Sequence, residues 1–160
     1  MRPAPENQLP RSAVRAWRIS SVLVGLLILM VPVFLWLLGL GEDGPPRWLA
    51  YGLAGAVAVC TGVWTLLIPE IRWRRWRYQV DEHEIDLRRG AIIISRTLVP
   101  ANRVQHVDTR QGPILRNYGL ADVTISTAAT THKIPALDEE TAELVRDRIS
   151  QFARLAQEDV

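Results

Sequence analysis

The amino-acid sequence predicts two transmembrane α-helices followed by a small, mainly β domain that ends in one α-helix. Two long stretches without a charged residue occupy residues 19–40 and 48–69. Beyond residue 77, short runs rich in β-branched residues alternate with turn residues, which is typical of a domain built from short strands. In the final segment, apolar residues recur at helical spacing, which indicates an amphipathic helix.

Each uncharged stretch reaches the roughly 20 residues that a helix needs to span a bilayer. A secretory signal peptide has a shorter apolar core and would supply only one such stretch. The pair therefore predicts a helical hairpin in a membrane.

Arginine is concentrated on the same side of both predicted spans. Arg11, Arg15 and Arg18 precede the first span, within an N-terminal segment of residues 1–18, and four arginines follow the second span. The connector, residues 41–47, is short and contains two acids. By the positive-inside rule, both termini are expected in the cytoplasm and the connector outside.

Residues 70–77 form a juxtamembrane segment rich in arginine and tryptophan. Its candidate membrane-interface residues are Arg72, Trp73, Arg74, Arg75, Trp76 and Arg77. One interpretation is a topology anchor with tryptophan rings at headgroup level. The other is attraction of anionic lipid, at about 1 kcal/mol per basic residue near the surface. The two are compatible, and neither implies a specific lipid.

Small residues recur every four positions along the second predicted span. They are Ala50, Ala54, Ala58 and Gly62. Small residues on one face let helix backbones approach closely. The face is expected either to pack on the first span of the same chain or to contact another membrane protein.

The domain, residues 78–156, opens with a predicted hairpin. Residues 84–88 alternate polar and apolar side chains, as a half-buried strand does. Gly90 marks a turn, and residues 91–99 form a second strand rich in isoleucine and valine.

Three further strands and a helix follow. Residues 103–110 form a strand in which Val104 and Val107 break the alternation, so a bulge is expected there. Residues 121–126 alternate clearly, and a short strand is expected over residues 131–134.

The closing helix has a recognisable start. Asp138 is placed to cap it, and the first turn holds Glu139 and Glu140, which the helix dipole favours. Its apolar face is expected to cover the open end of the sheet.

A candidate binding loop precedes the strand over residues 121–126. Its residues are Gln111, Gly112, Pro113, Tyr118 and Gly119. It is either a binding surface on a rigid sheet, or a structural turn that needs the freedom of glycine and the fixed angle of proline.

The charge of the chain is divided between its two parts. Residues 1–77 hold nine arginines against four acids, and residues 78–160 hold ten basic residues against thirteen acids. The domain is therefore slightly acidic, which argues against nucleic acid as a partner.

No motif predicts catalysis or a cofactor. His83, His106 and His132 are spread along the chain and Cys60 lies alone in an apolar run, so no metal site is expected. The chain lacks both a Gly-x-Ser-x-Gly elbow and a phosphate-binding loop. We therefore expect no enzyme; an enzyme would need a pocket with perturbed ionisable groups, which a sequence does not reveal.

Several stretches of the domain, taken together, resemble a known family. They are YQVD (78–81), IDLRRG (85–90), RVQHVD (103–108), QGPILR (111–116), YGLA (118–121) and IPALDEETA (134–142). This combination is similar to the bacterial pleckstrin-homology-like domain of YdbS-like membrane proteins, over residues 70–155, and the two preceding helices match the family's layout.

The resemblance implies a pleckstrin-homology-like fold, with two packed antiparallel sheets capped by a C-terminal helix. It also implies a bacterial cytoplasmic (inner) membrane location and, as partner, a larger membrane protein with several copies of the same domain. It supplies no catalytic residues. Phosphoinositide-binding relatives have basic residues on the first two strands and their loop, whereas residues 81–84 here are Asp-Glu-His-Glu. Acids repel phosphate, so no phosphoinositide is expected.

The leading hypothesis from the sequence is a non-catalytic, membrane-anchored interaction module at the cytoplasmic face. Its domain would bind a second membrane protein, in one arrangement through an exposed sheet edge. The alternative is a component that senses anionic lipid or envelope stress through the Arg-Trp segment.

Overall fold

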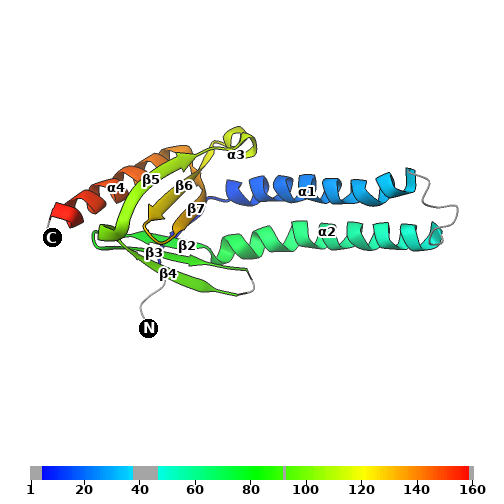
Figure 1. Ribbon diagram of the computed structural model, residues 1–160, viewed down its shortest axis with the longest axis horizontal. Helices are drawn as coiled ribbons and strands as arrows, with labels where there is room; N and C mark the ends of the chain where they lie inside the picture. The colour runs from blue at the N-terminus through cyan, green and yellow to red at the C-terminus, as the bar shows by residue number, and fades with distance from the viewer. Residues whose placement is uncertain (1–4, 38–46, 92, 159–160) are drawn as a thin grey trace. The chain divides into compact units, whose positions relative to one another are not determined.

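The computed structural model describes residues 5–37, 47–91 and 93–158. The chain forms two compact units (Figure 1). One unit, here called the domain, combines the N-terminal residues up to Ala16 with Ile71 and everything after it. The other, here called the helical hairpin, is Trp17–Glu70.

Two long helices account for the predicted spans. They are α1 (Ser12–Leu37) and α2 (Arg47–Arg75). Their stretches Ser12–Phe34 and Tyr51–Arg75 are long and apolar enough to cross a membrane. Helix α1 begins before the first uncharged stretch and α2 continues past the second, because the flanking arginines continue a helix readily. Of the predicted first span and the connector, residues 38–46 lie outside the described residues.

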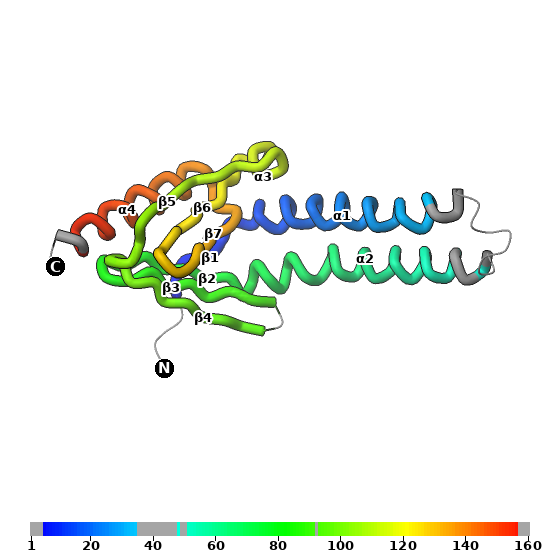
Figure 2. Tube along the Cα trace, viewed as in Figure 1, coloured from blue at the N-terminus to red at the C-terminus, as the bar shows by residue number. Residues whose placement is uncertain are grey.

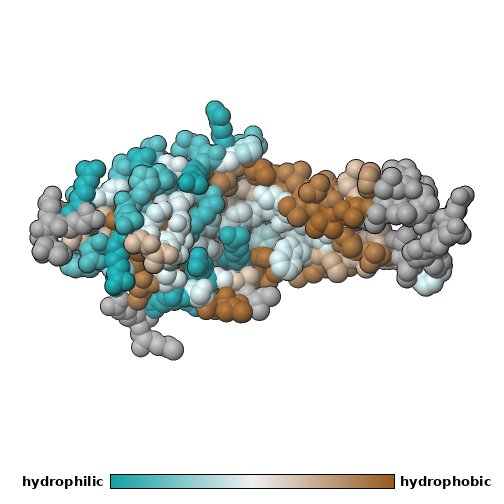
Figure 3. Space-filling model, viewed as in Figure 1, coloured by the Kyte–Doolittle hydropathy of each residue, from teal (hydrophilic) through white to brown (hydrophobic). Residues whose placement is uncertain are grey.

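The helical hairpin exposes most of its large apolar side chains, which Figure 3 shows in brown. A helix buried in a water-soluble protein would hide such side chains against its neighbours. Outward-facing apolar side chains are instead what a lipid environment favours, so the exposure agrees with the two predicted spans.

The domain contains two antiparallel sheets. The first has the order β1 (Asn7–Gln8), β2 (Arg77–Val80), β3 (Glu84–Arg89) and β4 (Ser95–Pro100). The second has the order β5 (Val104–Arg110), β6 (Leu120–Thr127) and β7 (Thr131–Asp138). The remaining elements are η1 (Ala101–Arg103), α3 (Pro113–Asn117) and α4 (Glu139–Glu158).

The core lies between the inner faces of the sheets and α4. Its largest fully buried side chains are Ile85, Leu87, Leu120, Val123, Ile125, Ile134, Leu137 and Ile149. Helix α4 contributes Ile149 and packs on η1, β5 and β6. The amphipathic closing helix therefore covers the sheets, as its periodicity predicts.

The N-terminal segment is part of the domain, which the sequence does not predict. Strand β1 pairs with β2, with Asn7 opposite Tyr78 and Gln8 opposite Arg77 (Figure 2). The next residue, Leu9, is buried in the core. The residues before the first long helix and those after the second therefore form one folded unit.

The hairpin predicted around Gly90 is confirmed, but its second strand is shorter than expected. Pairing begins at Arg89 opposite Ser95, so Ala91, Ile93 and Ile94 belong to the loop. Gly90 has a φ of +135°, and a Cβ there would lie 1.9 Å from the Ile93 carbonyl oxygen. The start of the apolar run therefore belongs to the turn, and the second strand begins only at Ser95.

Two irregularities shape the second sheet. The bulge expected near Val104 is present, as a register shift between Val104 and His106. A second shift lies between Ala121 and Val123 of β6. Opposite this shift, β7 continues to Asp138, four residues beyond the predicted strand end. The strand continues through Pro135 because a bulge leaves some ladder hydrogen bonds unmade and therefore tolerates proline.

Candidate functional site

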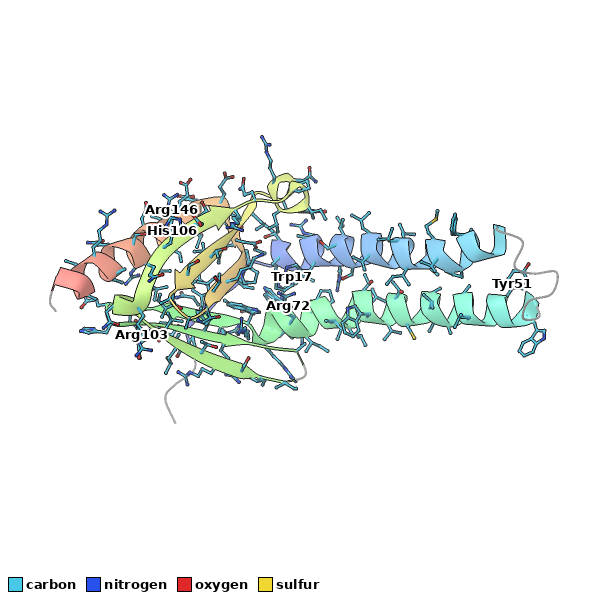
Figure 4. All side chains as sticks on the ribbon, viewed as in Figure 1. Trp17, Tyr51, Arg72, Arg103, His106 and Arg146 are labelled. Carbon is cyan, nitrogen blue, oxygen red and sulfur yellow. The ribbon has the colours of Figure 1, made fainter. Side chains whose placement is uncertain are left out.

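The Arg-Trp segment is divided between a helix end and the core. Helix α2 runs through Arg75, and its last turn holds Arg72, which Figure 4 labels, together with Arg74 and Arg75. Trp76 is only 3% exposed and belongs to the core of the domain. The expectation that the Trp76 ring lies among lipid headgroups is therefore wrong. Burial of so large a ring in the core stabilises the fold.

Trp73 also makes contacts within the domain. Its Nε1–H donates a hydrogen bond of 2.7 Å to the Leu9 carbonyl, and the Arg11 guanidinium lies 5.3 Å from its ring centroid. A tryptophan that is held in this way ties the N-terminal segment to the end of α2. An interface role of the segment's arginines stays a prediction.

Three arginines form a row across the first sheet, here called the arginine row. Arg77 is opposite Arg88, and Arg88 is opposite Arg96, so the three side chains leave the same face of β2, β3 and β4. Like charges directly opposite each other are unfavourable in a sheet. Asp86 offsets part of this repulsion, because its carboxylate accepts hydrogen bonds of 3.1 and 3.0 Å from the Arg96 Nε–H. These bonds raise the pKa of Arg96.

Two residues of the small-residue stripe of α2, Ala58 and Gly62, do not face α1. Ala58 and Gly62 are exposed, and a Cβ added to Gly62 would meet nothing within 4 Å. The close approach is at Gly25 of α1, where an added Cβ would lie 2.1 Å from Thr61 Cγ2. The expectation of packing within the chain is therefore wrong for Ala58 and Gly62.

The other two residues of the stripe are Ala50 and Ala54. Ala54 is half-buried, and the side chain of Ala50 lies outside the described part of the chain. Contact of the stripe with another membrane protein stays a prediction.

The candidate binding loop surrounds α3. Gln111, Gly112 and Pro113 are exposed at its start, and Gly112 has an ordinary φ of −84°. Gly119 ends α3 with a φ of +62°, and its carbonyl accepts a hydrogen bond of 3.0 Å from the Glu139 N–H. Tyr118 is half-buried, with the Arg15 guanidinium 5.7 Å from its ring. The left-handed backbone is thus required at Gly119 and not at Gly112.

Asp122 has a structural position that the sequence does not reveal. Its Oδ1 accepts a hydrogen bond of 2.8 Å from the buried N–H of Ala136, which has a φ of +52°. Its Oδ2 lies 2.6 Å from Nζ of Lys133. One carboxylate therefore holds the second bulge, where a left-handed non-glycine residue is otherwise costly.

Among the described residues, no group of three or more histidine, cysteine or acidic side chains could hold a metal ion. In the helical hairpin, a mainly apolar groove is lined by residues of both helices, including Ser20, Gly25, Thr61 and Trp64. The groove brings no acid and base together, so it offers no proton-transfer chemistry.

His132 provides a pH-dependent contribution to stability. It is 9% exposed, and its Nδ1 has no hydrogen-bond partner among the described residues. Burial lowers its pKa, and the charge of Arg89 lowers it further. The folded domain therefore favours neutral His132, so this contribution is complete above the unfolded value of about 6.5 and is lost as the pH falls through the folded value.

We expect the melting temperature of the detergent-solubilised chain to fall as the pH is lowered below about 6.5. The fall should be smaller in His132→Gln, because its amide does not take up a proton in this range. His83→Gln serves as control, because His83 is exposed in the β2–β3 turn. Equal pH dependence in wild type and His132→Gln would contradict this assignment.

Comparison with known proteins identifies the family of the chain. The model of the family described as "Bacterial PH domain" matches residues 10–153. The UPF0699 transmembrane protein YdbS of Bacillus subtilis (strain 168) is 42% identical over the full length of both chains. The UPF0699 transmembrane protein YdbT of the same organism is 24% identical over 108 residues, which cover 64% of this chain and 22% of YdbT.

No solved structure shows significant similarity to the chain. The matched region of the PH family model includes both long helices and nearly all of the domain. Together with full-length similarity to YdbS, the match confirms the resemblance and the fold class that the sequence predicts. The chain therefore belongs to the UPF0699 family of transmembrane proteins and carries a bacterial PH domain.

Proposed function

We propose that this chain is a non-catalytic, membrane-anchored interaction module at the cytoplasmic face of the bacterial inner membrane. Its domain binds a second membrane protein that carries similar domains. The observation that carries the proposal is the exposed edge strand β4, which has one strand neighbour in the first sheet.

Strand β4 differs from the other sheet edges. Its residues are mostly exposed, and Leu98 presents an apolar side chain that is 46% exposed. Strand β1 is only two residues long, β5 is packed by α4, and most of β7 is buried. A long exposed edge is a ready template for a strand from another chain, with side-chain pockets adding specificity.

The class of partner is suggested by the similarity to YdbT. YdbT is a second UPF0699 transmembrane protein, and it contains a region related to 64% of this chain. A partner with a related domain in the same membrane would present its own edge strand at a similar distance from the bilayer. Membrane anchoring of both proteins also raises their effective concentration.

Two features support this location: one indicates the cytoplasmic side, and the other indicates that both ends of the chain lie on the same side of the membrane. Arginines flank both spans on the side of the domain. In addition, β1 precedes the first span and β2 follows the second, yet the two strands pair in one sheet. One folded sheet lies on one side of a bilayer, so both spans together return the chain to the side where it began.

The test is purification of the full-length chain from its native membrane in mild detergent. Wild type should retain a membrane protein with a bacterial PH domain at constant stoichiometry. Leu98→Lys should reduce its recovery about tenfold or more, because a charge at a buried contact is costly. Leu144→Lys is the matched control, since Leu144 is 65% exposed on α4. Absence of such a partner in wild type would refute the proposal.

A second set of variants locates any contact within the membrane. Changing Ala54, Ala58 and Gly62 to leucine blocks close helix approach on the stripe. Loss of the partner in this variant, with recovery unchanged in Leu98→Lys, would place the contact on α2. If the leucine variant retains the partner, the contact lies on the domain.

The second candidate function is sensing of anionic lipid or envelope stress. It is favoured by the basic last turn of α2, which holds Arg72, Arg74 and Arg75. This candidate predicts a chain that purifies with anionic lipid alone and whose domain responds to anionic vesicles in a strongly salt-dependent way. A stoichiometric, salt-insensitive protein complex would argue against it.

A further inference from the structure

The end of the β3–β4 hairpin exposes large apolar side chains. Ile93 is 83% exposed, the highest value among the large hydrophobic side chains that the structure describes, and Ile94 is 46% exposed. Figure 3 shows brown apolar atoms at this end of the hairpin. Water contact with two adjacent isoleucines is unfavourable at about 25 cal/mol per Å² of apolar surface.

Gly90 constrains the start of the loop. Gly90 adopts a φ of +135°, and the space where its Cβ would lie is occupied by the carbonyl of Ile93. The turn therefore brings the Ile93 carbonyl against Gly90, where no side chain would fit. A loop held by such a turn presents its apolar side chains at low entropic cost.

This hairpin end is tied to the end of the second spanning helix. The Arg75 guanidinium donates a hydrogen bond to the carbonyl of Ala91, within the domain. Arg75 is also the last residue of α2 and of its membrane-compatible stretch Tyr51–Arg75. The loop is therefore hydrogen-bonded to the last residue of the membrane-compatible stretch.

The loop is flanked by arginines in sequence, one of which, Arg96, is paired with Asp86, and the end of α2 that contacts the loop is also basic. Residues 71–77 contain four arginines and residues 88–96 contain three, and neither stretch contains an acid. Arg88 and Arg96 of the arginine row flank the loop on either side in sequence. Apolar side chains surrounded by arginines are the combination that enters the headgroup region of an anionic bilayer.

We propose that Ile93 and Ile94 insert into the headgroup region of the bilayer that holds the two helices, while the surrounding arginines bind anionic phospholipid headgroups. The hairpin end thus fixes the domain against the membrane. A lipid surface fits this feature better than a protein partner, because it accounts for the two isoleucines, the arginines and the attachment to the helix end together. The inference holds under either proposed function.

The test uses full-length protein in a Cys60→Ser background, so that a single introduced cysteine carries a polarity-sensitive fluorophore. The label is placed at Ile93→Cys or, as matched control, at exposed Leu144→Cys. The protein is reconstituted in vesicles of phosphatidylcholine, or of equal parts phosphatidylcholine and phosphatidylglycerol. Quenchers attached to lipid and aqueous iodide then report where each label lies.

We expect the label at position 93 to shift to shorter emission wavelength, to be quenched by the lipid-borne quencher and to be shielded from iodide. The label at position 144 should show the opposite. Two outcomes would overturn the proposal: iodide access at position 93 equal to that at position 144, or shielding of position 93 from both quenchers. The second would indicate that a protein covers the loop.

The charge requirement is tested separately. Arg88→Gln should reduce the extra lipid quenching that phosphatidylglycerol gives at position 93, and raised salt should do the same. Arg103→Gln is the matched control, since Arg103 lies in η1, just beyond the opposite end of β4 (Figure 4). Equal effects of the two variants would overturn the role of the arginines. Unchanged melting temperatures would show that neither variant acts through the fold.

Discussion

Replacing Asp122 with alanine is expected to lower the free energy of unfolding of the domain by about 2–3 kcal/mol. The substitution leaves the buried N–H of Ala136 without its acceptor at the second bulge. An unsatisfied buried donor costs more than the net value of the bond that satisfied it, and bonds to a charged acceptor are at the strong end of the range. Urea unfolding of the chain in detergent measures the loss.

Two variants separate the roles of this carboxylate. Asp122→Asn retains an oxygen that accepts the Ala136 N–H, so its loss should be clearly smaller than that of alanine. Lys133→Met removes only a cation whose side chain is 55% exposed, and exposed ion pairs contribute little. If Lys133→Met were as damaging as Asp122→Ala, the ion pair and not the bulge would be the source of the effect.

Gly25→Leu is expected to weaken the packing of α1 on α2 by about 1–3 kcal/mol, the usual cost of overpacking a tight contact. The Cβ alone would lie 2.1 Å from Thr61 Cγ2, so the helices must separate or Thr61 must move. Close approach of small residues is a main source of helix association in a bilayer. Titration of the detergent-solubilised protein with a denaturing detergent, followed by circular dichroism, measures the change.

The matched control for this prediction is Gly62→Leu. A Cβ at Gly62 meets nothing within 4 Å, so the helical hairpin should tolerate the change. Adding Thr61→Ala to Gly25→Ala should restore stability, because it removes the methyl group that the new Cβ would strike. Equal effects of Gly25→Leu and Gly62→Leu would mean that the two helices do not pack through Gly25.

Much of the fold was predictable because its signals are local. The two uncharged stretches, the alternation over residues 121–126 and the start of α4 after Asp138 each depend on a few neighbouring residues. The bulge at Val104 was also visible, as a break in the alternation. Periodicity of this kind reports which face of an element is buried, whatever lies against it.

The candidate sites were less predictable because they depend on partners far apart in sequence. The small-residue stripe has the spacing of a packing face, yet spacing alone does not say which face of α2 meets α1. Trp76 is a residue type that is common at membrane interfaces, but in the folded chain its side chain is buried in the core. The arginine row has no signal in the order of residues, because its register depends on the length of the loop after Gly90.

The two membrane helices, the mainly β domain and the closing helix are all predictable from the order of residues, since hydropathy and periodicity act within each element. Three contacts are visible only in the folded chain: Asn7 and Gln8 complete the first sheet beside β2, Asp122 holds Ala136 at the second bulge, and Arg75 binds the loop after Gly90. Each of these contacts joins separate elements, and their geometry follows from packing and strand register, which local propensity does not encode.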